Sequence, residues 1–230
     1  MIYITGDTHR DFARVRDFCE ENGTTYDDTL IILGDAGINL YLDYQDTALK
    51  EELREYPITM FMIHGNHEER PSEIDTYQEK IWQGGVVYYE EDYPNLLFAK
   101  DGEIYDFDGA KAIVIGGAYS IDKYYRLRNN LPWFENEQPS EEIMDYVERQ
   151  LDNADWRVDY VFSHTAPKQY EPTWAFAPEV SQELVDKTTE EWLDTIERRL
   201  DYDYWYCGHY HVESQEGPIR IMFTNFDELD

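Results

Sequence analysis

The stretch Ile2-Tyr3-Ile4-Thr5-Gly6-Asp7-Thr8-His9 joins four residues typical of a β-strand to a polar turn. Residues 11–22 follow with the pattern of a helix, and Gly23 is typical of a helix end. The same alternation repeats with a strand at 30–33, a helix at 44–56 before Pro57, and a strand at 58–63. This β-α-β-α-β order predicts parallel strands with helices on the faces of the sheet, because parallel strands need crossover connections.

The middle of the chain has several short strands with few helices between them. These strands are predicted at 86–89, 96–99, 103–107 and 112–115. The dipeptides Asp101-Gly102 and Asp108-Gly109 lie between them and predict hairpin turns, because both types of residue tolerate a positive φ.

The last part of the chain returns to alternating helices and strands. We predict a helix from Ser140, a strand at 158–162, a helix at 181–200, a strand at 204–207 and an edge strand at 219–223. The sequence contains no internal repeat, low-complexity tract or linker. It therefore indicates a single domain spanning residues 1–230.

The composition excludes several classes of protein. The 230 residues include 19 Lys and Arg against 50 Asp and Glu, which gives a net charge of −31 and makes nucleic acid an unlikely partner. No apolar run approaches the ~18 residues that span a bilayer, and Met1 leads directly into a predicted strand, so we expect neither a membrane segment nor a signal peptide. The two cysteines, Cys19 and Cys207, indicate no disulfide framework, so we expect a cytoplasmic protein.

The excess of acidic residues has two interpretations. Most carboxylates are expected on solvated helix faces, where they keep the protein in solution. A few of them, next to histidines, can instead bind metal ions, and composition alone does not identify which.

The histidines share a position in the predicted fold. Each one follows a predicted strand or ends it: His9, His64, His67, His164, His209 and His211. The carboxyl ends of parallel strands meet at one edge of a sheet, so these side chains are expected to converge although they are distant in sequence.

The neighbours of the histidines strengthen this expectation. Asp7 and His9 are two residues apart, and Gly34-Asp35 and Gly65-Asn66-His67 each follow a strand. The segment Gly208-His209-Tyr210-His211 repeats the spacing of two residues. Carboxylate, amide and imidazole ligands suit Mn, Fe or Zn better than a thiolate site does, so we expect Cys207 to lie in the core.

These motifs, in this order from Gly6 to His211, resemble the calcineurin-like metallophosphoesterase family. The resemblance implies an α/β fold with four layers, α/β/β/α, in which helices flank a β-sandwich that holds two divalent metal ions. One ion would be bound by Asp7, His9, Asp35 and His211, and the other by Asp35, Asn66, His164 and His209. Asp35 would bridge the ions, and His67 would remain unligated near the scissile phosphate as a catalytic residue or as a structural hydrogen-bond partner.

The implied chemistry is hydrolysis of a phosphate mono- or diester by a hydroxide that bridges the two metals. Paired cations lower the pKa of bound water and neutralise phosphoryl oxygens, and a protonated His67 can give a proton to the leaving group. The charge favours a small-molecule or nucleotide substrate. The alternatives are a nuclease and a binding scaffold without catalysis; the sequence does not indicate an oligomeric state.

The second motif departs from one branch of the family. Protein phosphatases continue it as Gly-Asp-x-x-Asp-Arg-Gly, whereas this chain has Gly34-Asp35-Ala36-Gly37-Ile38-Asn39. Phosphate contacts therefore fall to other residues. The candidates are Arg10, Arg70 and Arg126, each of which can also be a solvated surface residue; we favour Arg70.

Two further segments follow strand ends and are rich in aromatic residues and proline. They are residues 119–139 and 167–178, and we expect them to wall the substrate crevice. Their aromatic residues Trp133, Phe134, Trp174 and Phe176 can stack on a substrate or pack against the domain. His64 lies outside the implied ligand set, and we expect it to line the site or to support a ligand.

Overall fold

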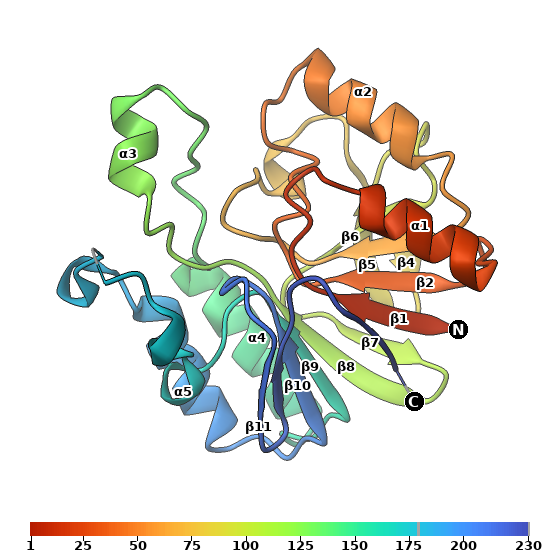
Figure 1. Cartoon of the computed structure of the whole chain (residues 1–230). Helices are drawn as coiled ribbons and strands as arrows, with labels where there is room; N and C mark the ends of the chain where they lie inside the picture. The colour runs from red at the N-terminus through yellow and green to blue at the C-terminus, as the bar shows by residue number, and fades with distance from the viewer. Residues whose placement is uncertain (179, 230) are drawn as a thin grey trace.

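Two mixed β-sheets lie face to face, with helices on both outer sides (Figure 1). The computed structural model describes residues 1–178 and 180–229. Helices α1 (Ala13–Asn22) and α2 (Tyr44–Leu53) cover one outer face. Helices α4 (Glu141–Asn153) and α5 (Thr188–Glu197) cover the other. The α/β/β/α order of layers is therefore confirmed.

The first sheet contains the predicted β-α-β-α-β unit. Its strand order is β13-β1-β2-β3-β6-β5-β4, and β1, β2, β3 and β6 are parallel to one another. The strands span β1 Ile2–Thr5, β2 Thr29–Ile32, β3 Thr59–Met62, β4 Gln78–Trp82, β5 Gly85–Tyr89, β6 Leu96–Ala99 and β13 Phe226–Glu228. Helix α1 connects β1 to β2, and α2 connects β2 to β3.

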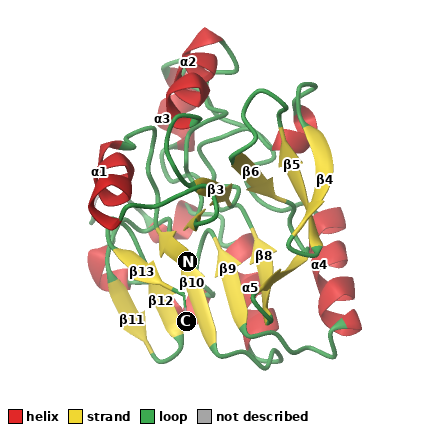
Figure 2. Ribbon diagram, turned by 90° about the vertical axis from the view of Figure 1, so that its right-hand side faces the viewer, coloured by secondary structure: helices red, strands yellow, loops and turns green. Residues whose placement is uncertain are grey.

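The second sheet also has a parallel centre. Figure 2 shows its strands side by side in the order β11-β12-β10-β9-β8, and β7 completes it beyond β8. The strands span β7 Ile104–Phe107, β8 Ala110–Ile115, β9 Tyr160–Ser163, β10 Tyr204–Cys207, β11 Ser214–Glu216 and β12 Ile219–Ile221. Because β8, β9, β10 and β12 are parallel, the loops after β9 and β10 emerge at one edge.

Alternating side chains along the central strands build the layers. Ile31 of β2 packs into the core between the two sheets, whereas its neighbours Leu30 and Ile32 pack beneath α1 and α2. A third cluster lies between the second sheet and its helices, and it includes Trp205 and Cys207. The expectation that Cys207 lies in the core is therefore confirmed.

Local signals explain where several helices begin and end. Gly23 ends α1 with φ 62°, and its N–H donates to the Cys19 carbonyl at 2.9 Å. Ser140 caps α4 by accepting the N–H of Ile143 at 3.3 Å. Within the described part of the chain, no helix has the length and apolar character needed to cross a membrane.

One of the two predicted hairpin turns is correct. Asp108-Gly109 joins β7 to β8 with φ values of 55° and 101°, as a tight antiparallel turn requires. The prediction for Asp101-Gly102 is wrong, because β6 and β7 belong to different sheets and the chain crosses between them here. The Asp101 carboxylate stabilises this crossing by accepting the N–H of Gly116 at 2.6 Å.

The predicted edge strand at 219–223 is an interior strand. Its observed part, β12, lies between β10 and β11, and β11 forms the edge. The chain then continues to the first sheet, where β13 pairs with β1. Strands β4, β11 and β13 were not predicted, because residues such as Gln78, Gln215 and Asp227 give them a polar pattern.

The predicted helix at 181–200 is shorter than expected. Helix α5 begins at Thr188, where the Asp186 carboxylate accepts the Thr188 N–H at 3.0 Å. The preceding residues form a 3-10 turn at Gln182–Leu184, and Leu184 is 77% exposed. The apolar spacing of 181–187 therefore does not correspond to a buried helical face.

The remaining elements lie in long loops. They are the short helix α3 (Lys123–Arg128) and the 3-10 turns η1 Pro71–Glu73, η2 Lys168–Tyr170, η3 Thr173–Ala175 and η4 Gln182–Leu184. In Figure 1, α3 and the loop before α5 project on the left, beyond the ends of the central strands.

Candidate metal centre and active-site cavity

The carboxyl ends of five strands from the two sheets meet at one edge of the sandwich. Strands β1, β2 and β3 bring Asp7 and His9, Asp35, and Asn66 and His67 to this edge, and β9 and β10 bring His164, His209 and His211. The backbone N–H of His209 donates to Oδ1 of Asp7 at 2.9 Å, which joins the two sheets. The convergence predicted from the sequence is therefore observed for five of the six histidines, and His64 is the exception.

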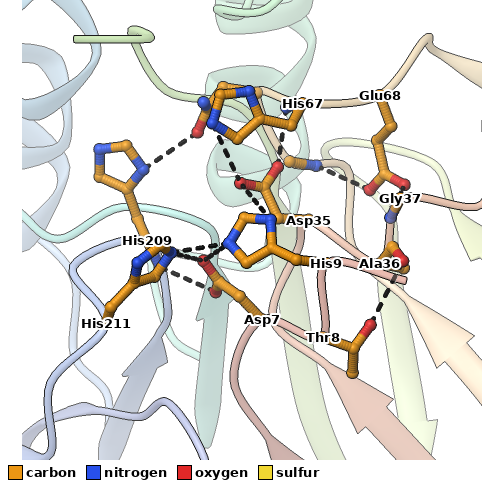
Figure 3. A network of polar contacts seen from close by, with 12 residues as sticks. Asp7, Thr8, His9, Asp35, Ala36, Gly37, His67, Glu68, His209 and His211 are labelled. Atoms are coloured by element: carbon orange, nitrogen blue, oxygen red, sulfur yellow. Dashed lines mark hydrogen bonds and ion pairs between the residues drawn. The ribbon is translucent and has the colours of Figure 1, made fainter. Parts of the chain in front are cut away.

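Asp7, His9 and His211 form one group of converging ligand atoms (Figure 3). Oδ2 of Asp7 lies 3.2 Å from Nε2 of His211 and 3.6 Å from Nε2 of His9. This oxygen is buried and has no hydrogen-bond partner among the residues described. Burial disfavours the charged form, but the two imidazoles outweigh this and hold the pKa of Asp7 well below its usual range.

Asp35 lies between the two parts of the centre. Its Oδ2 is 3.7 Å from Nε2 of His164, 3.9 Å from Nδ1 of His9 and 4.0 Å from Nε2 of His67. Its other oxygen accepts the backbone N–H of His67 at 2.8 Å. The carboxylate is thus oriented by the loop after β3, and one oxygen is directed at the ring nitrogens.

Asn66, His164 and His209 form the other part of the centre. The Asn66 amide donates to Oγ of Ser120 at 2.9 Å, which directs its Oδ1 toward Nε2 of His164 at 2.8 Å and Nδ1 of His209 at 3.0 Å. Nδ1 of His164 donates to the Leu33 carbonyl at 2.7 Å. When the ring is neutral, its Nε2 therefore carries no hydrogen and faces Oδ1 of Asn66 as a second acceptor. Burial lowers the pKa of His209 well below its usual value, so the His209 ring is neutral.

Acceptor atoms that face one another at hydrogen-bond distance can bind the same cation. Carboxylate oxygens, an amide oxygen and neutral imidazole nitrogens are ligands for divalent transition metals. The carbonyl that accepts from the far nitrogen of His164 is also typical of the support that metal-binding histidines receive. The residues present therefore fit a metal centre, and the seven residues that the family resemblance implied as ligands lie together.

Unusual backbone conformations direct these side chains. His9, Asp35, His209 and His211 have φ values of 46°, 48°, 68° and 52°, which non-glycine residues adopt at a cost of the order of 1–3 kcal/mol each. Gly34 has φ 99°, and a Cβ there would lie 2.1 Å from Nδ1 of His164. Only glycine allows His164 to approach the end of β2 so closely.

His67 lies beside the ligand cluster and lines a cavity of about 350 Å³. Burial lowers the pKa of His67, the Asp35 carboxylate opposes this shift, and the Arg126 guanidinium adds to it. This position of His67, beside the candidate ligands and at the cavity, agrees with the unligated residue that the family resemblance implied. In the protein alone, the lowered pKa favours the neutral imidazole.

The three candidate phosphate-binding arginines lie in different environments. Arg10 donates to the Gly37 carbonyl at 2.6 Å and to Asp46 at 2.5 Å, on the side of α2. Arg70, which we favoured from the sequence, forms a buried ion pair with Asp101 and donates to the Asn136 carbonyl at 2.9 Å. It lines two other cavities.

Arg126 is the candidate that acts electrostatically on His67. It forms an ion pair at 2.8 Å with Asp122, which lines the same cavity as His67. This charge effect, and the burial of Arg70 in its ion pair with Asp101, move our preference for a phosphate contact from Arg70 to Arg126.

Both aromatic-rich segments wall the cavity. Tyr119 and Asp122 come from the first segment and Phe176 comes from the second, and residues 180–190 complete the wall. Trp133 donates instead to Glu137 at 2.7 Å, Trp174 is 71% exposed, and Phe134 is half-buried outside the residues that line this cavity. Of the four aromatic residues singled out, Phe176 therefore lies at the cavity.

Two buried glutamates at the site were not anticipated. Glu68 accepts the backbone N–H groups of Gly37 at 3.0 Å and Gly65 at 3.2 Å, and burial together with Asp35 raises its pKa to about 8. Glu190, in the first turn of α5, lines the cavity and is 3% exposed. The position of Glu68 directly after His67 was the available signal; Glu190 resembles an ordinary acidic residue at a helix start.

His64 does not line the main cavity. It is 3% exposed and borders a separate cavity of about 200 Å³ together with Arg70. Burial, and then the charge of Arg70, lowers its pKa well below the usual value. His64 thus lies just after β3 beside Arg70, outside the residues that line the main cavity.

Residues 1–213 match the model of the calcineurin-like phosphoesterase family. The match covers most of the chain, which therefore belongs to this family, and phosphoester hydrolysis in general is supported. The resemblance noted from the sequence motifs is confirmed.

Two solved structures share the fold. The protein TT1561 of Thermus thermophilus has a TM-score of 0.52 and 10% sequence identity, over 96% of this chain and 87% of that chain. The phosphopantetheinyl hydrolase of Mycobacterium tuberculosis has a TM-score of 0.52 and 14% identity, with the same coverage of 96% and 87%. At these identities the likeness concerns the fold alone. A search of curated proteins found no significant sequence match.

Proposed function

We propose that the protein hydrolyses phosphate mono- or diesters with the help of two divalent metal ions. The observation that carries this proposal is the set of acceptor atoms that face one another across the strand ends, above all Nε2 of His164 against Oδ1 of Asn66 at 2.8 Å. Such an arrangement fits bound cations, and the family supports phosphoester hydrolysis.

The proposed ligands divide into two sets that share Asp35. Asp7, His9, Asp35 and His211 hold one ion, and Asp35, Asn66, His164 and His209 hold the other. Two bound ions supply water activation near neutral pH and neutralise charge on the phosphoryl oxygens. The neutral Asn66 contributes a ligand oxygen without adding charge, so the centre retains attraction for an anionic substrate.

His67 and Arg126 are proposed to act on the phosphoryl group. Nε2 of His67 is 4.0 Å from Oδ2 of Asp35, and its side chain is 18% exposed at the cavity. A bound phosphate anion favours protonation of this imidazole, which then donates the proton to the leaving oxygen. Arg126, paired with Asp122, adds positive charge on the same side.

The substrate is proposed to be a small phosphate ester, as in a nucleotide or another small molecule. The cavity of about 350 Å³ suits a ligand of this size. A net charge of −31 opposes the approach of a long polyanion, so a nuclease activity is disfavoured. The free, buried Cys19 and Cys207 agree with a reducing cytoplasm as the proposed location.

The proposal is tested by hydrolysis of bis(p-nitrophenyl) phosphate and p-nitrophenyl phosphate by the Mn²⁺-loaded protein. We expect activity that Asp35→Ala and His164→Ala abolish, because each variant removes a proposed ligand. Asp17→Ala is the matched control, since this aspartate is 63% exposed and lies on α1. Circular dichroism verifies that each variant is folded.

The opposite results are informative as well. If the protein, with metal occupancy verified by elemental analysis, leaves a broad panel of mono- and diesters intact, the proposed enzymatic function is wrong. Calorimetric binding of metal and phosphate without turnover would then favour a binding scaffold on the same fold.

A further inference from the structure

Glu190 places an unused hydrogen-bond acceptor at the wall of the main cavity. Its Oε1 accepts the hydroxyl hydrogen of Thr165 at 2.9 Å. Its Oε2 is buried and has no hydrogen-bond partner within residues 1–178 and 180–229. Leaving a buried carboxylate oxygen without a donor is unfavourable, so this atom marks a place where a donor can bind.

The position of Glu190 is fixed relative to the candidate metal centre. Thr165 directly follows His164, and its hydroxyl lies 2.8 Å from the hydroxyl of Tyr210. Tyr210 in turn lies between His209 and His211 in the chain. The carboxylate is therefore held by the same two strand ends that position the proposed ligands.

The cavity around Glu190 is largely apolar. The rings of Phe176 and Tyr210 line it, with their centroids 6.2 Å apart and an angle of 21° between their planes, and Ile121 and Val185 line it as well. Such walls hold the organic part of a ligand, and a small number of polar groups then determine which ligand is accepted.

The neighbouring Glu191 shows what a carboxylate does in this helix when it has only a structural role. Glu191 is in the same first turn of α5, its side chain is 59% exposed, and it pairs with Lys168 at 2.5 Å. Glu190 instead points inward, and burial raises its pKa to about 7. The helix start therefore explains Glu191 but does not explain the orientation of Glu190.

We infer that Glu190 selects phosphate esters whose organic part carries a hydrogen-bond donor, either a hydroxyl or an amino group, which binds to its Oε2. This inference rests on the proposed function and specifies its substrate class. The apolar walls hold the body of the organic part, and Glu190 recognises its donor. An ester without a donor leaves Oε2 buried and unpaired, and it binds less tightly for this reason.

The test uses phosphonates, which are not hydrolysed and therefore report binding alone. Calorimetry with the Mn²⁺-loaded protein compares ω-hydroxyalkyl- and ω-aminoalkylphosphonates of increasing length with alkylphosphonates one methylene longer. At a pH above 7, where the Glu190 carboxylate is charged, we expect one donor-bearing member to bind roughly tenfold more tightly than its alkyl match, as a hydrogen bond to a charged group provides. The series in which this occurs identifies the donor as hydroxyl or amino.

Substitution assigns the preference to Glu190. In Glu190→Leu we expect the preference for the donor-bearing phosphonate to disappear, while the affinity for the alkylphosphonates is retained. In the control Glu191→Leu we expect this preference to persist. If Glu190→Leu does not fold, Glu190→Gln must reduce the preference, because a neutral amide makes the weaker hydrogen bond. Equal binding of every matched pair, or a preference that survives these substitutions, overturns the inference.

This outcome is separable from that of the proposed function. Hydrolysis of bis(p-nitrophenyl) phosphate, measured on the same preparations, tests catalysis without involving a donor group. Lack of turnover contradicts the proposed function, whereas the phosphonate series decides independently whether Glu190 recognises a donor.

Discussion

The backbone N–H of His209 donates to Oδ1 of Asp7 at 2.9 Å, and this bond joins the ends of β10 and β1 across the two sheets. It engages one carboxylate oxygen and leaves Oδ2 directed at the imidazoles of His9 and His211. One side chain thus holds the sheets in register at this edge and also presents a candidate metal ligand.

These two roles of Asp7 can be separated with Asp7→Asn. The amide retains an oxygen for the His209 N–H but removes the charge, so we expect a folded protein with weakened metal binding. A ligand at 100 times its Kd raises the unfolding free energy of the protein that binds it by about 2.7 kcal/mol. We expect Asp7→Asn to lose most of the increase that Mn²⁺ gives to the wild-type protein. Thermal unfolding with and without Mn²⁺ measures it, and Asp17→Asn is the control. An unchanged Mn²⁺ effect would remove Asp7 from the ligand set.

Gly34→Ala is expected to disrupt the centre. Its Cβ would lie 2.1 Å from the His164 ring, and φ is 99°. Gly109→Ala is a matched control, because φ there is 101° and nothing lies within 4 Å of the added Cβ. Both variants carry the backbone cost of about 1–2 kcal/mol, but only Gly34→Ala should also lose Mn²⁺ binding and activity. Equal behaviour of the two would show that the close approach of His164 is unimportant.

Glu68→Gln should weaken the loops that carry Asp35 and Asn66. The carboxyl group accepts the N–H groups of Gly37 and Gly65, and an amide places an NH₂ group against one of them. We expect a loss of about 1–3 kcal/mol in unfolding free energy and about 10–100-fold weaker metal binding. Urea unfolding and metal titration measure these effects. The exposed Glu91→Gln is the control, and wild-type values in Glu68→Gln would contradict this role.

Arg70→Gln and Arg126→Gln should have opposite effects. Arg70→Gln leaves Asp101 buried without its partner, so we expect a loss of about 3–5 kcal/mol in stability and an unchanged KM. Arg126→Gln removes a positive charge near His67, so we expect KM for a phosphate monoester to rise on the order of tenfold with little change in stability. A raised KM in Arg70→Gln together with an unchanged KM in Arg126→Gln would instead identify Arg70 as the phosphate contact.

Glu190 should make the stability of the metal-free protein depend on pH. Burial raises its pKa from the ordinary value of 4.5 to about 7, so between these values the folded protein binds more protons than the unfolded chain. Its contribution is therefore present at low pH and is lost as the pH rises through 7. The difference in unfolding free energy between the wild-type protein and Glu190→Gln should therefore change by about 3 kcal/mol between the two pKa values. Urea unfolding between about pH 5 and pH 8 measures it, and a constant difference would contradict the raised pKa.

Hydrophobic patterning was sufficient to predict the parallel core of the fold. Strands β1, β2 and β3 are apolar runs such as Leu30 to Leu33, and their helices have clear end signals such as Gly23. The meeting of the polar motifs at one edge could be predicted for the same reason, since they directly follow such runs, whereas the assignment of ligands was implied by the family resemblance. Parallel strands then bring the motifs together without any further information.

The features that were missed depend on contacts that no local pattern contains. Asp101-Gly102 has the composition of a hairpin turn, but its chain ends belong to different sheets. Arg70 resembles a surface arginine until its pairing with Asp101 is known. Glu68 and Glu190 are charged residues whose burial arises from tertiary packing.

The bond between Asp7 and His209 spans 202 positions of the chain. A ribosome synthesises Asp7 directly after β1, and His209 and His211 only after β10. A nascent chain that ends with β8 therefore lacks three histidines of the candidate centre: His164, His209 and His211. The proposed ligand set is consequently completed late in biosynthesis, and products of translation that end before His164 contain only part of it.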